Sequence, residues 1–231
     1  MRMQDLATQL GKARLVDLSK KVSPGKVEGP VGLPARKYEI KLFKFPPGEL
    51  MHYIEMESHI STHVEAPSHF LPASRGIEGD DISQIPLTSL FGMCVFVNCK
   101  GVPPKTEVGR EILGRFPIMA GDIVLLGNAD HGGWDRCYIS KEGAEYLVEK
   151  KVKMFGVDDT VFPEATQFLL KDLKSYFVHD LLLAHNIPII EGLTNMGALR
   201  RTRFLFLGFP AMMGGLESFP IRAIAFEGED D

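Results

Sequence analysis

Cysteine is scarce in this 231-residue sequence, with single residues at positions 94, 99 and 137. An odd and sparse set of thiols argues against a disulfide scaffold and is typical of a reducing compartment. Cys94 and Cys99 stand five positions apart, a spacing that matches neither a zinc knuckle nor a redox pair. We therefore expect buried, inert thiols.

Long apolar runs and blocks of basic residues are also missing. No stretch reaches the roughly 18 apolar residues of a membrane-spanning helix, and residues 1–21 lack the apolar core and cleavage site of a secretory signal. The formal net charge is −4, which argues against nucleic acid or an anionic membrane as a partner. We expect a cytoplasmic protein that acts on a small molecule.

The composition, with 45% hydrophobic and 24% charged residues, is close to the average of globular proteins and supports a substantial core. We expect one domain over residues 1–231, of the α/β class, with strands outnumbering helices. Residues 23–34 are rich in glycine and proline and predict a loop beside a binding site. Periodicity predicts strands at 13–19, 36–45, 93–98, 122–127, 153–159, 188–193, 204–210 and 219–226, and helices at 140–152 and 177–186.

The segment SHISTHVEAPSHF, residues 58–70, concentrates nitrogen and carboxylate ligands. In an extended chain, its odd positions share one face and its even positions share the other. In a regular strand, His63 and Glu65, two residues apart, would be separated by only about 7 Å. His59 and His63, four residues apart, would be separated by about 13 Å, too far for both to bind one ion. We therefore predict a turn, bulge or short helical twist near residues 61–64 that lets His59, His63 and Glu65 converge on a metal.

Two other readings of this segment are weaker. A helix would also bring His59 and His63 together, but Ile60, Thr62, Val64 and Pro67 disfavour a continuous helix. The second reading is a polar strand face with solvated histidines. Four potential ligands in phase argue against that reading.

Further ligands should come from another segment. DHGGWD, residues 130–135, offers Asp130, His131 and Asp135, whereas residues 178–193 offer His179 early in a helix and Glu191 at the end of an apolar strand. A buried carboxylate at position 191 needs a metal or a counter-charge. The structural alternative for Glu191 is an ion pair with Arg200, Arg201 or Arg203, and His185 lies on a different face of the helix from His179.

Together these residues resemble the metal-dependent cyclase superfamily, which includes bacterial-type kynurenine formamidase and isatin hydrolase. Its hallmark is His-x-Gly-Thr-His-x-Asp-x-Pro-x-His. His59, Thr62, His63, Pro67 and His69 match it, while Ser61 replaces the glycine and Glu65 the aspartate. VDLS, GDIVLL, FGVDD, the H-x11-E-G-L pair of His179 and Glu191, and GGLESFPIRAIA extend the likeness over nearly the whole chain.

The resemblance implies a swivelling β/β/α fold with a mainly β core and flanking helices, assembled as a homodimer or homotetramer. It implies one or two divalent ions, Zn²⁺ or Mn²⁺. His59, His63 and Glu65 would hold the first ion, Glu65, His179 and Glu191 would complete a second, and His69 would be the catalytic base. Because Ser61 lacks the freedom of glycine, we expect the turn there to be one that an ordinary residue adopts.

A divalent ion in such a site lowers the pKa of bound water to about 7 and polarises a carbonyl oxygen. The expected activity is hydrolysis of an amide, either an arylformamide such as N-formylkynurenine or a cyclic amide such as isatin. Phe70, Leu71, Trp134 and Phe162 are candidates for an apolar substrate wall, although core packing is the more usual role for aromatic residues at such positions. The alternatives are a metal-dependent lyase or cyclase, and a metal-binding relative without catalysis.

Overall fold

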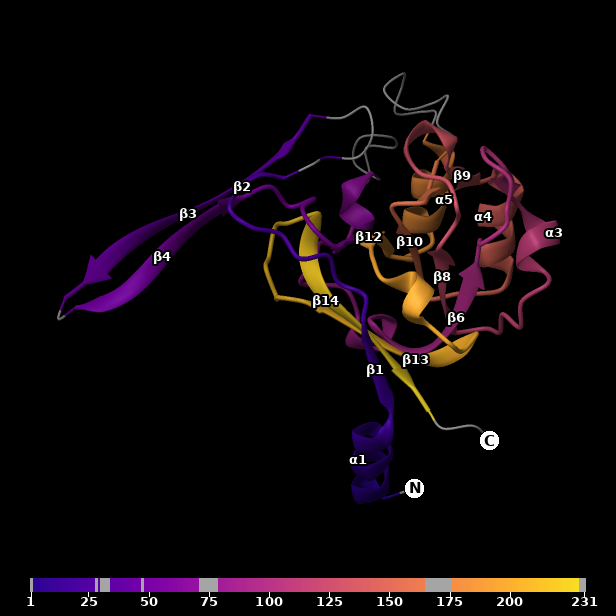
Figure 1. Ribbon diagram of the computed structural model, residues 1–231, viewed down its shortest axis with the longest axis horizontal. Coiled ribbons are helices and arrows are strands. Elements are labelled where there is room, and N and C mark those ends of the chain that lie inside the picture. The colour runs from indigo at the N-terminus through magenta and orange to yellow at the C-terminus, as the bar shows by residue number, and fades with distance from the viewer. Residues whose placement is uncertain are drawn as a thin grey trace.

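The computed structural model describes residues 2–27, 29, 34–46, 48–70, 79–164 and 176–228. Its largest sheet has the strand order β1-β14-β13-β6-β8-β10-β12-β5, and β14 also pairs with β5. That last pairing closes the strands from β14 to β5 into a barrel (Figure 1). The strands of this sheet are β1 (Arg14–Asp17), β5 (His63–Glu65), β6 (Phe91–Asn98), β8 (Ile123–Gly127), β10 (Met154–Asp158), β12 (Ile189–Leu193), β13 (Arg203–Pro210) and β14 (Ser218–Glu227).

Apolar side chains lie on both faces of the central strands. β6, β8, β10 and β12 are mutually parallel neighbours, and parallel strands are usually covered on both sides. Cys94 and Phe96 belong to one buried cluster, whereas Val95 and Val97 belong to the other. The period of two therefore divides each strand between two cores, and the near-continuous apolar runs in the sequence follow from it.

Helices cover one face of this sheet. α4 (Lys141–Glu149) begins after Ser140, whose side chain caps the helix by accepting a hydrogen bond from the Gly143 N–H. α5 (Phe177–Ala184) packs against α4 and β12. The other α-helices in the described part of the chain are α1 (Met3–Lys12) and the short α3 (Arg110–Leu113). Among the described residues, no helix is both long and apolar enough to cross a membrane.

Two smaller sheets complete the described structure. β7 (Glu107–Val108), β9 (Cys137–Ile139) and β11 (Val161–Phe162) form a parallel sheet in the order β11-β9-β7. β2 (Gly25–Val27), β3 (Arg36–Phe45) and β4 (Glu49–Met56) form an antiparallel sheet. The β3–β4 hairpin extends well away from the barrel (Figure 1).

The predicted α/β class and every predicted strand and helix are confirmed, with boundaries that shift by a few residues. The reading of residues 23–34 as loop throughout is wrong, because Gly25–Val27 pairs with β3 as strand β2. All three cysteines are buried free thiols, as expected.

Candidate metal centre

A turn separates the first histidine of the segment from the strand that follows. β5 begins only at His63, and Ser61 has a left-handed φ of 63°. The predicted turn is therefore confirmed. The expectation that Ser61 would adopt an ordinary backbone is wrong, because a left-handed φ is uncommon for residues other than glycine. The Ser61 hydroxyl donates a hydrogen bond to the Lys20 carbonyl, which offsets part of the strain.

The turn is tied to the neighbouring strands through Thr62. Its hydroxyl donates to the Gly192 carbonyl at 2.6 Å and accepts from the Lys20 N–H at 2.8 Å. Gly192 has a φ of 70°, and a Cβ there would lie 2.6 Å from the Ser61 carbonyl oxygen. A glycine after Glu191 is therefore needed for β12 to approach the turn this closely. In the β5–β12 ladder, His63 lies opposite Glu191.

Five side chains meet around the carboxylate of Glu65, which is only 2% exposed. Together with Glu65 itself we call them the Glu65 cluster: His59, His63, Glu65, His69, His179 and Glu191. Glu65 Oε1 lies 3.1 Å from His59 Nδ1, 3.8 Å from His63 Nε2 and 3.6 Å from His69 Nε2. Its Oε2 lies 3.4 Å from His179 Nε2, which is also 3.4 Å from Glu191 Oε1.

The cluster contains two possible metal sites that share Glu65. His59, His63 and Glu65 form one group of ligand atoms within 4.8 Å of one another, and Glu65, His179 and Glu191 form another. These are the two sets that the resemblance implied. The extra methylene of glutamate, compared with the aspartate of the hallmark, still lets the two carboxylate oxygens face both groups.

Two buried atoms of the cluster are suited to a cation. His63 Nε2 and Glu65 Oε2 are buried without a hydrogen-bond partner, which is costly unless a further group satisfies them. His63 Nδ1 lies 3.1 Å from the Ser61 carbonyl oxygen, so Nδ1 carries the proton and leaves Nε2 as an acceptor. Divalent ions held by the two ligand groups would satisfy both atoms.

Glu164 orients the ring of His179, as the Ser61 carbonyl orients that of His63. Its Oε1 accepts a hydrogen bond from the His179 N–H at 2.8 Å and lies 3.1 Å from His179 Nδ1. A carboxylate at Nδ1 holds the ring so that Nε2 faces Glu65 and Glu191, as outer carboxylates do for metal-binding histidines. Sequence analysis did not identify Glu164, because nothing in the sequence relates it to a histidine 15 positions later.

The charges of the cluster favour an ionised carboxylate. Burial raises the pKa of Glu65, but the neighbouring imidazoles of His69, His179, His59 and His63 outweigh it and hold that pKa well below its usual range. Burial lowers the pKa of His69, and the nearby Glu65 only partly compensates. His69 is therefore mainly neutral at neutral pH and can accept a proton.

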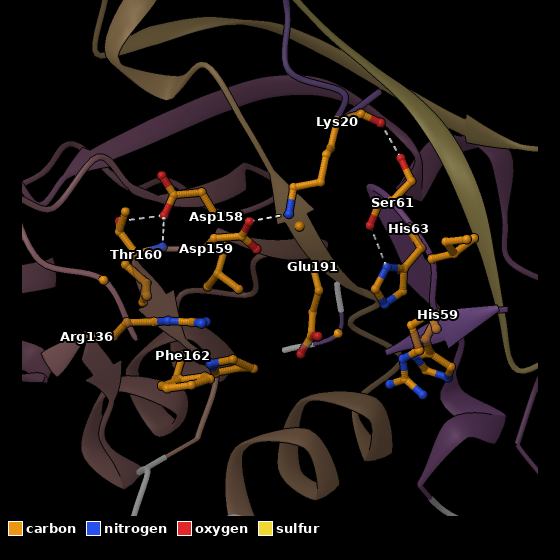
Figure 2. Close-up of a pocket in the computed structure, with 18 of the residues that line it drawn as sticks. Lys20, His59, Ser61, His63, Arg136, Asp158, Asp159, Thr160, Phe162 and Glu191 are labelled. Atoms are coloured by element: carbon orange, nitrogen blue, oxygen red, sulfur yellow. Dashed lines mark hydrogen bonds and ion pairs between the residues drawn. The ribbon is translucent and has the colours of Figure 1, made fainter. Parts of the chain in front are cut away.

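The cluster forms part of the wall of a cavity of about 440 Å³. Figure 2 shows His59 and His63 on one side of it, Arg136 and Phe162 on the other, and Glu191 between them. Lys20, Asp158, Asp159 and Thr160 also line the cavity. A small molecule held there would contact the ligand groups directly.

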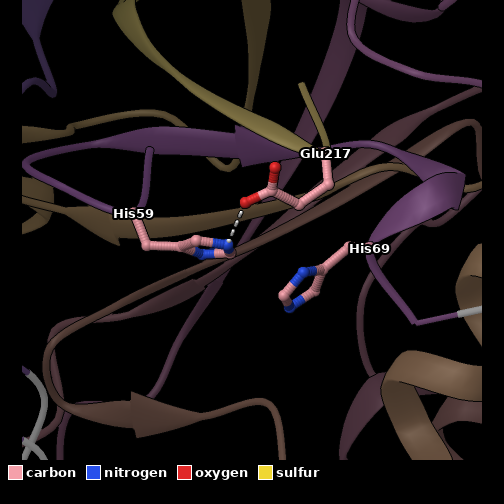
Figure 3. A group of neighbouring side chains, drawn as sticks. All are labelled: His59, His69 and Glu217. Carbon is pink, nitrogen blue, oxygen red and sulfur yellow. Dashed lines mark ion pairs between the residues drawn. The ribbon is translucent and has the colours of Figure 1, made fainter. Parts of the chain in front are cut away.

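Glu217 is a further acidic neighbour that sequence analysis missed. Its Oε1 lies 3.2 Å from His59 Nε2 and accepts a hydrogen bond from the Ser58 hydroxyl at 2.6 Å. Figure 3 shows Glu217 and His69 on the same side of the His59 ring. Glu217 immediately precedes β14, and the pairing of β14 with β5 brings it here. Its place in the GGLESFPIRAIA motif was the one available signal.

Several other candidates lie away from the cluster. Asp130 accepts a hydrogen bond from the Gly101 N–H, and Asp135 pairs with Lys105. Neither these carboxylates nor His131 joins a ligand group among the described residues. The His185 side chain is hydrogen-bonded to the Leu181 carbonyl at the end of α5.

The arginines considered for Glu191 also have other partners. Arg203 forms an ion pair with Asp122, and the backbone N–H groups of Arg200 and Arg201 donate to Glu227. Glu191 instead faces His179. The ion-pair alternative for Glu191 with Arg203 is therefore wrong.

The proposed apolar wall is only partly present. Phe162 lines the cavity, whereas Trp134 is 51% exposed and lies outside it. Phe70 is buried in the core and packs its ring against His69 and His179. Leu71 lies outside the described residues.

Comparisons with known proteins find relatives of similar sequence and solved structures of the same fold. The kynurenine formamidase of Erythrobacter litoralis (strain HTCC2594) is 29% identical over 179 residues, which cover 74% of each protein. Isatin hydrolase A from Labrenzia aggregata, solved with benzyl benzoate, superposes with a TM-score of 0.80 at 21% identity, covering 98% of this chain and 99% of that one. A potential metal-dependent hydrolase with cyclase activity superposes at 0.70 with 22% identity, covering 94% and 99%.

The two solved structures share the fold of this chain. A family model described as putative cyclase matches residues 10–162, a range that contains β1, β5, the turn at Ser61 and most of the parallel strands. The chain therefore belongs to the cyclase family.

Proposed function

We propose that the protein is a metal-dependent hydrolase of a non-peptide amide bond, acting on an arylformamide such as N-formylkynurenine or a cyclic amide such as isatin. The observation that carries the proposal is the Glu65 cluster, with its two unsatisfied buried acceptors beside a cavity. Membership of the cyclase family and the named activities of the relatives above support it.

The ligand set fits one or two divalent ions. His59, His63 and Glu65 would hold one, and Glu65, His179 and Glu191 a second. Three imidazoles and two carboxylates suit Zn²⁺ and also admit Mn²⁺. A bound ion would polarise a carbonyl oxygen and lower the pKa of water towards neutrality.

The side chain of His69 supplies the acid–base step. It follows β5 on a single turn of 3-10 helix, Pro67–His69, and packs edge-on against the Phe70 ring. The neutral ring accepts a proton from the attacking water, and the Glu65 carboxylate, 3.6 Å from His69 Nε2, stabilises the imidazolium that results. The same ring then returns the proton to the leaving nitrogen.

Metal content and turnover test this function together. We expect the protein, reconstituted with Zn²⁺ or Mn²⁺, to hold one or two equivalents by plasma mass spectrometry and to hydrolyse N-formylkynurenine or isatin. Metal without hydrolysis of either amide would favour the lyase or the non-catalytic alternative, which product analysis separates. Failure to bind metal would contradict the proposal.

We also propose that the chain forms a homodimer or homotetramer through the β3–β4 hairpin. Ile40 lies opposite Ile54 in the hairpin, and Leu42 and Leu50 share their face by the alternation of strand side chains. All four are at least 42% exposed. Exposed apolar surface of this kind on a projecting element is typical of an interface.

Introducing charge on the apolar face of the hairpin tests the assembly. We expect Leu42→Lys combined with Ile54→Lys to shift the protein towards monomer, because each buried charge weakens association by about tenfold or more, roughly 1.4 kcal/mol. Glu39→Lys, on the opposite face, is the matched control and should keep the assembly. Light scattering after gel filtration measures the mass; a wild-type monomer, or a double variant of unchanged mass, would contradict the interface.

The single domain over residues 1–231 and the cytoplasmic location belong to the same proposal. Three buried free thiols support the location, because such thiols are usual in a reducing compartment.

A further inference from the structure

Arg136 is a buried cation in the cavity wall. Arg136 is only 7% exposed, and its Nε is buried without a hydrogen-bond partner. Among the residues that the structure describes, no carboxylate lies within ion-pair distance of its guanidinium. A buried charge without a partner is costly to the folded state.

The other lysine and arginine of the cavity wall are already paired. Lys20 forms an ion pair with Asp159, and Arg36 forms one with Glu57. Asp158 is equally occupied, because its two oxygens accept hydrogen bonds from the Asn128 N–H and from the N–H and hydroxyl of Thr160. Glu191, the third acid whose charge acts on Arg136, faces His179. Each of these acids therefore has another partner, and Arg136 remains available to a molecule in the cavity.

The fold holds the Arg136 guanidinium in a fixed place. Arg136 immediately precedes β9, and Phe162 lies on β11, which pairs with β9 in parallel. The guanidinium carbon lies 4.0 Å from the centre of the Phe162 ring. Stacking of this kind covers one face of the guanidinium and leaves its edge free for a planar, bidentate partner.

The cavity has room for such a partner between Arg136 and the Glu65 cluster. Figure 2 shows Arg136 and Phe162 across the cavity from His59 and His63. Its volume of about 440 Å³ is within the usual range for small-molecule sites, about 300–1,000 Å³. A molecule that spans it can place one end at Arg136 and an amide carbonyl at the cluster.

We propose that Arg136 binds a carboxylate of the substrate, so that the enzyme prefers amides that carry an acidic group. This inference rests on the proposed function, because it treats the cavity beside the Glu65 cluster as the substrate site. It separates the two example substrates: N-formylkynurenine carries a carboxylate, whereas isatin is neutral. The aromatic ring of Phe162 beside the guanidinium suits an aryl acid.

Binding to the metal-free protein tests the inference without turnover. We expect 2-aminobenzoate to bind more tightly than the neutral 2-aminobenzamide in calorimetric titrations. Arg136→Gln should weaken binding of the acid by about 10- to 100-fold, as for the loss of a charge-assisted hydrogen bond, and leave binding of the amide unchanged. Arg136→Lys, which keeps the charge but loses the planar fork, should fall between.

The matched control is Arg222→Gln, which removes an arginine that is paired with Asp17 and does not line the cavity. It should bind 2-aminobenzoate as the wild type does. Equal affinity of wild type and Arg136→Gln for the acid would overturn the inference, and so would a wild type that binds neither compound or prefers the amide. An equal loss of affinity in Arg222→Gln would attribute the effect to the overall charge of the protein and would also overturn the inference.

Kinetics of the metal-loaded enzyme extend the test. With 2-formamidobenzoate, Arg136→Gln should raise KM by about 10- to 100-fold, whereas kcat/KM for the neutral formanilide should not change. A parallel loss on both substrates would contradict a role in recognising the acid. If the loaded wild type hydrolyses neither these two formamides nor N-formylkynurenine or isatin, the proposed function fails, and the calorimetric result still decides whether Arg136 binds a carboxylate.

Discussion

His69→Ala is expected to lower kcat by about 10²- to 10⁴-fold, the usual contribution of a general acid–base residue, while the protein retains its metal. The expectation follows from the position of the ring. His69 belongs to neither of the two ligand groups that share Glu65, yet its Nε2 lies 3.6 Å from Glu65 Oε1. A proton transferred to His69 therefore stays beside a carboxylate, and an alanine removes the acceptor without removing a ligand from either group.

The measurement pairs kcat for the better of the two amides with metal equivalents on the same preparation. His69→Gln is a useful second variant, because it keeps much of the volume of the ring beside Phe70 but cannot shuttle a proton. Both variants should show the same loss of turnover. An alternative role exists, since His59, His69 and Glu217 also form a possible ligand group. Loss of metal from His69→Ala in proportion to its activity would assign His69 to that group and contradict its role as base.

His185→Ala is the matched control for this experiment. His185 is exposed at the end of α5, and its Nδ1 is hydrogen-bonded to the Leu181 carbonyl at 2.8 Å. Its removal should leave both kcat and metal content at the wild-type level. A similar loss in both variants would indicate a general effect of removing histidine.

The parts of the fold that sequence predicts are those with a regular period or a buried run. Residues 36–45 alternate and form β3 over the same range, and the apolar run at 122–127 becomes the wholly buried β8. β4 escaped detection because ELMHYIEM mixes apolar and polar residues on both faces, and seven of its eight residues are exposed. β2 escaped because it is three residues long in a glycine-rich segment and is stabilised by pairing with β3.

For the site, too, sequence predicts the residues that follow a local pattern and misses those placed by long-range contacts. The local spacing in residues 58–70 requires a turn for convergence, and the left-handed Ser61 supplies it. The contributions of Glu164, Glu217 and Arg136 depend on contacts that no local pattern encodes. Glu217 reaches His59 only because β14 pairs with β5 and closes the barrel. Arg136 enters the cavity wall only because β9 and β11, far apart in sequence, are neighbours.

The second large effect is expected at the centre of the cluster, where Glu65→Gln should abolish stable metal binding. Glu65 is shared by both ligand groups, so the substitution removes a negative ligand from each at once. Removal of an outer hydrogen-bond partner already costs about 10- to 100-fold in metal affinity, and loss of a direct, shared ligand should exceed that range. Activity should fall with metal content, in contrast to His69→Ala.

Glu65→Asp and Glu227→Gln are the controls for this result. The first keeps the carboxylate at the site, and the second removes a buried carboxylate elsewhere. Aspartate restores the hallmark residue and keeps the charge, so Glu65→Asp should retain metal. Glu227 is another buried carboxylate, 3% exposed and paired with Arg14, but it lies outside the cluster. Glu227→Gln should lower thermal stability while keeping wild-type metal equivalents. If Glu65→Gln instead holds as much metal as Glu227→Gln in equilibrium dialysis, Glu65 is not the shared ligand, and the ions must bind through the histidines and Glu191 alone.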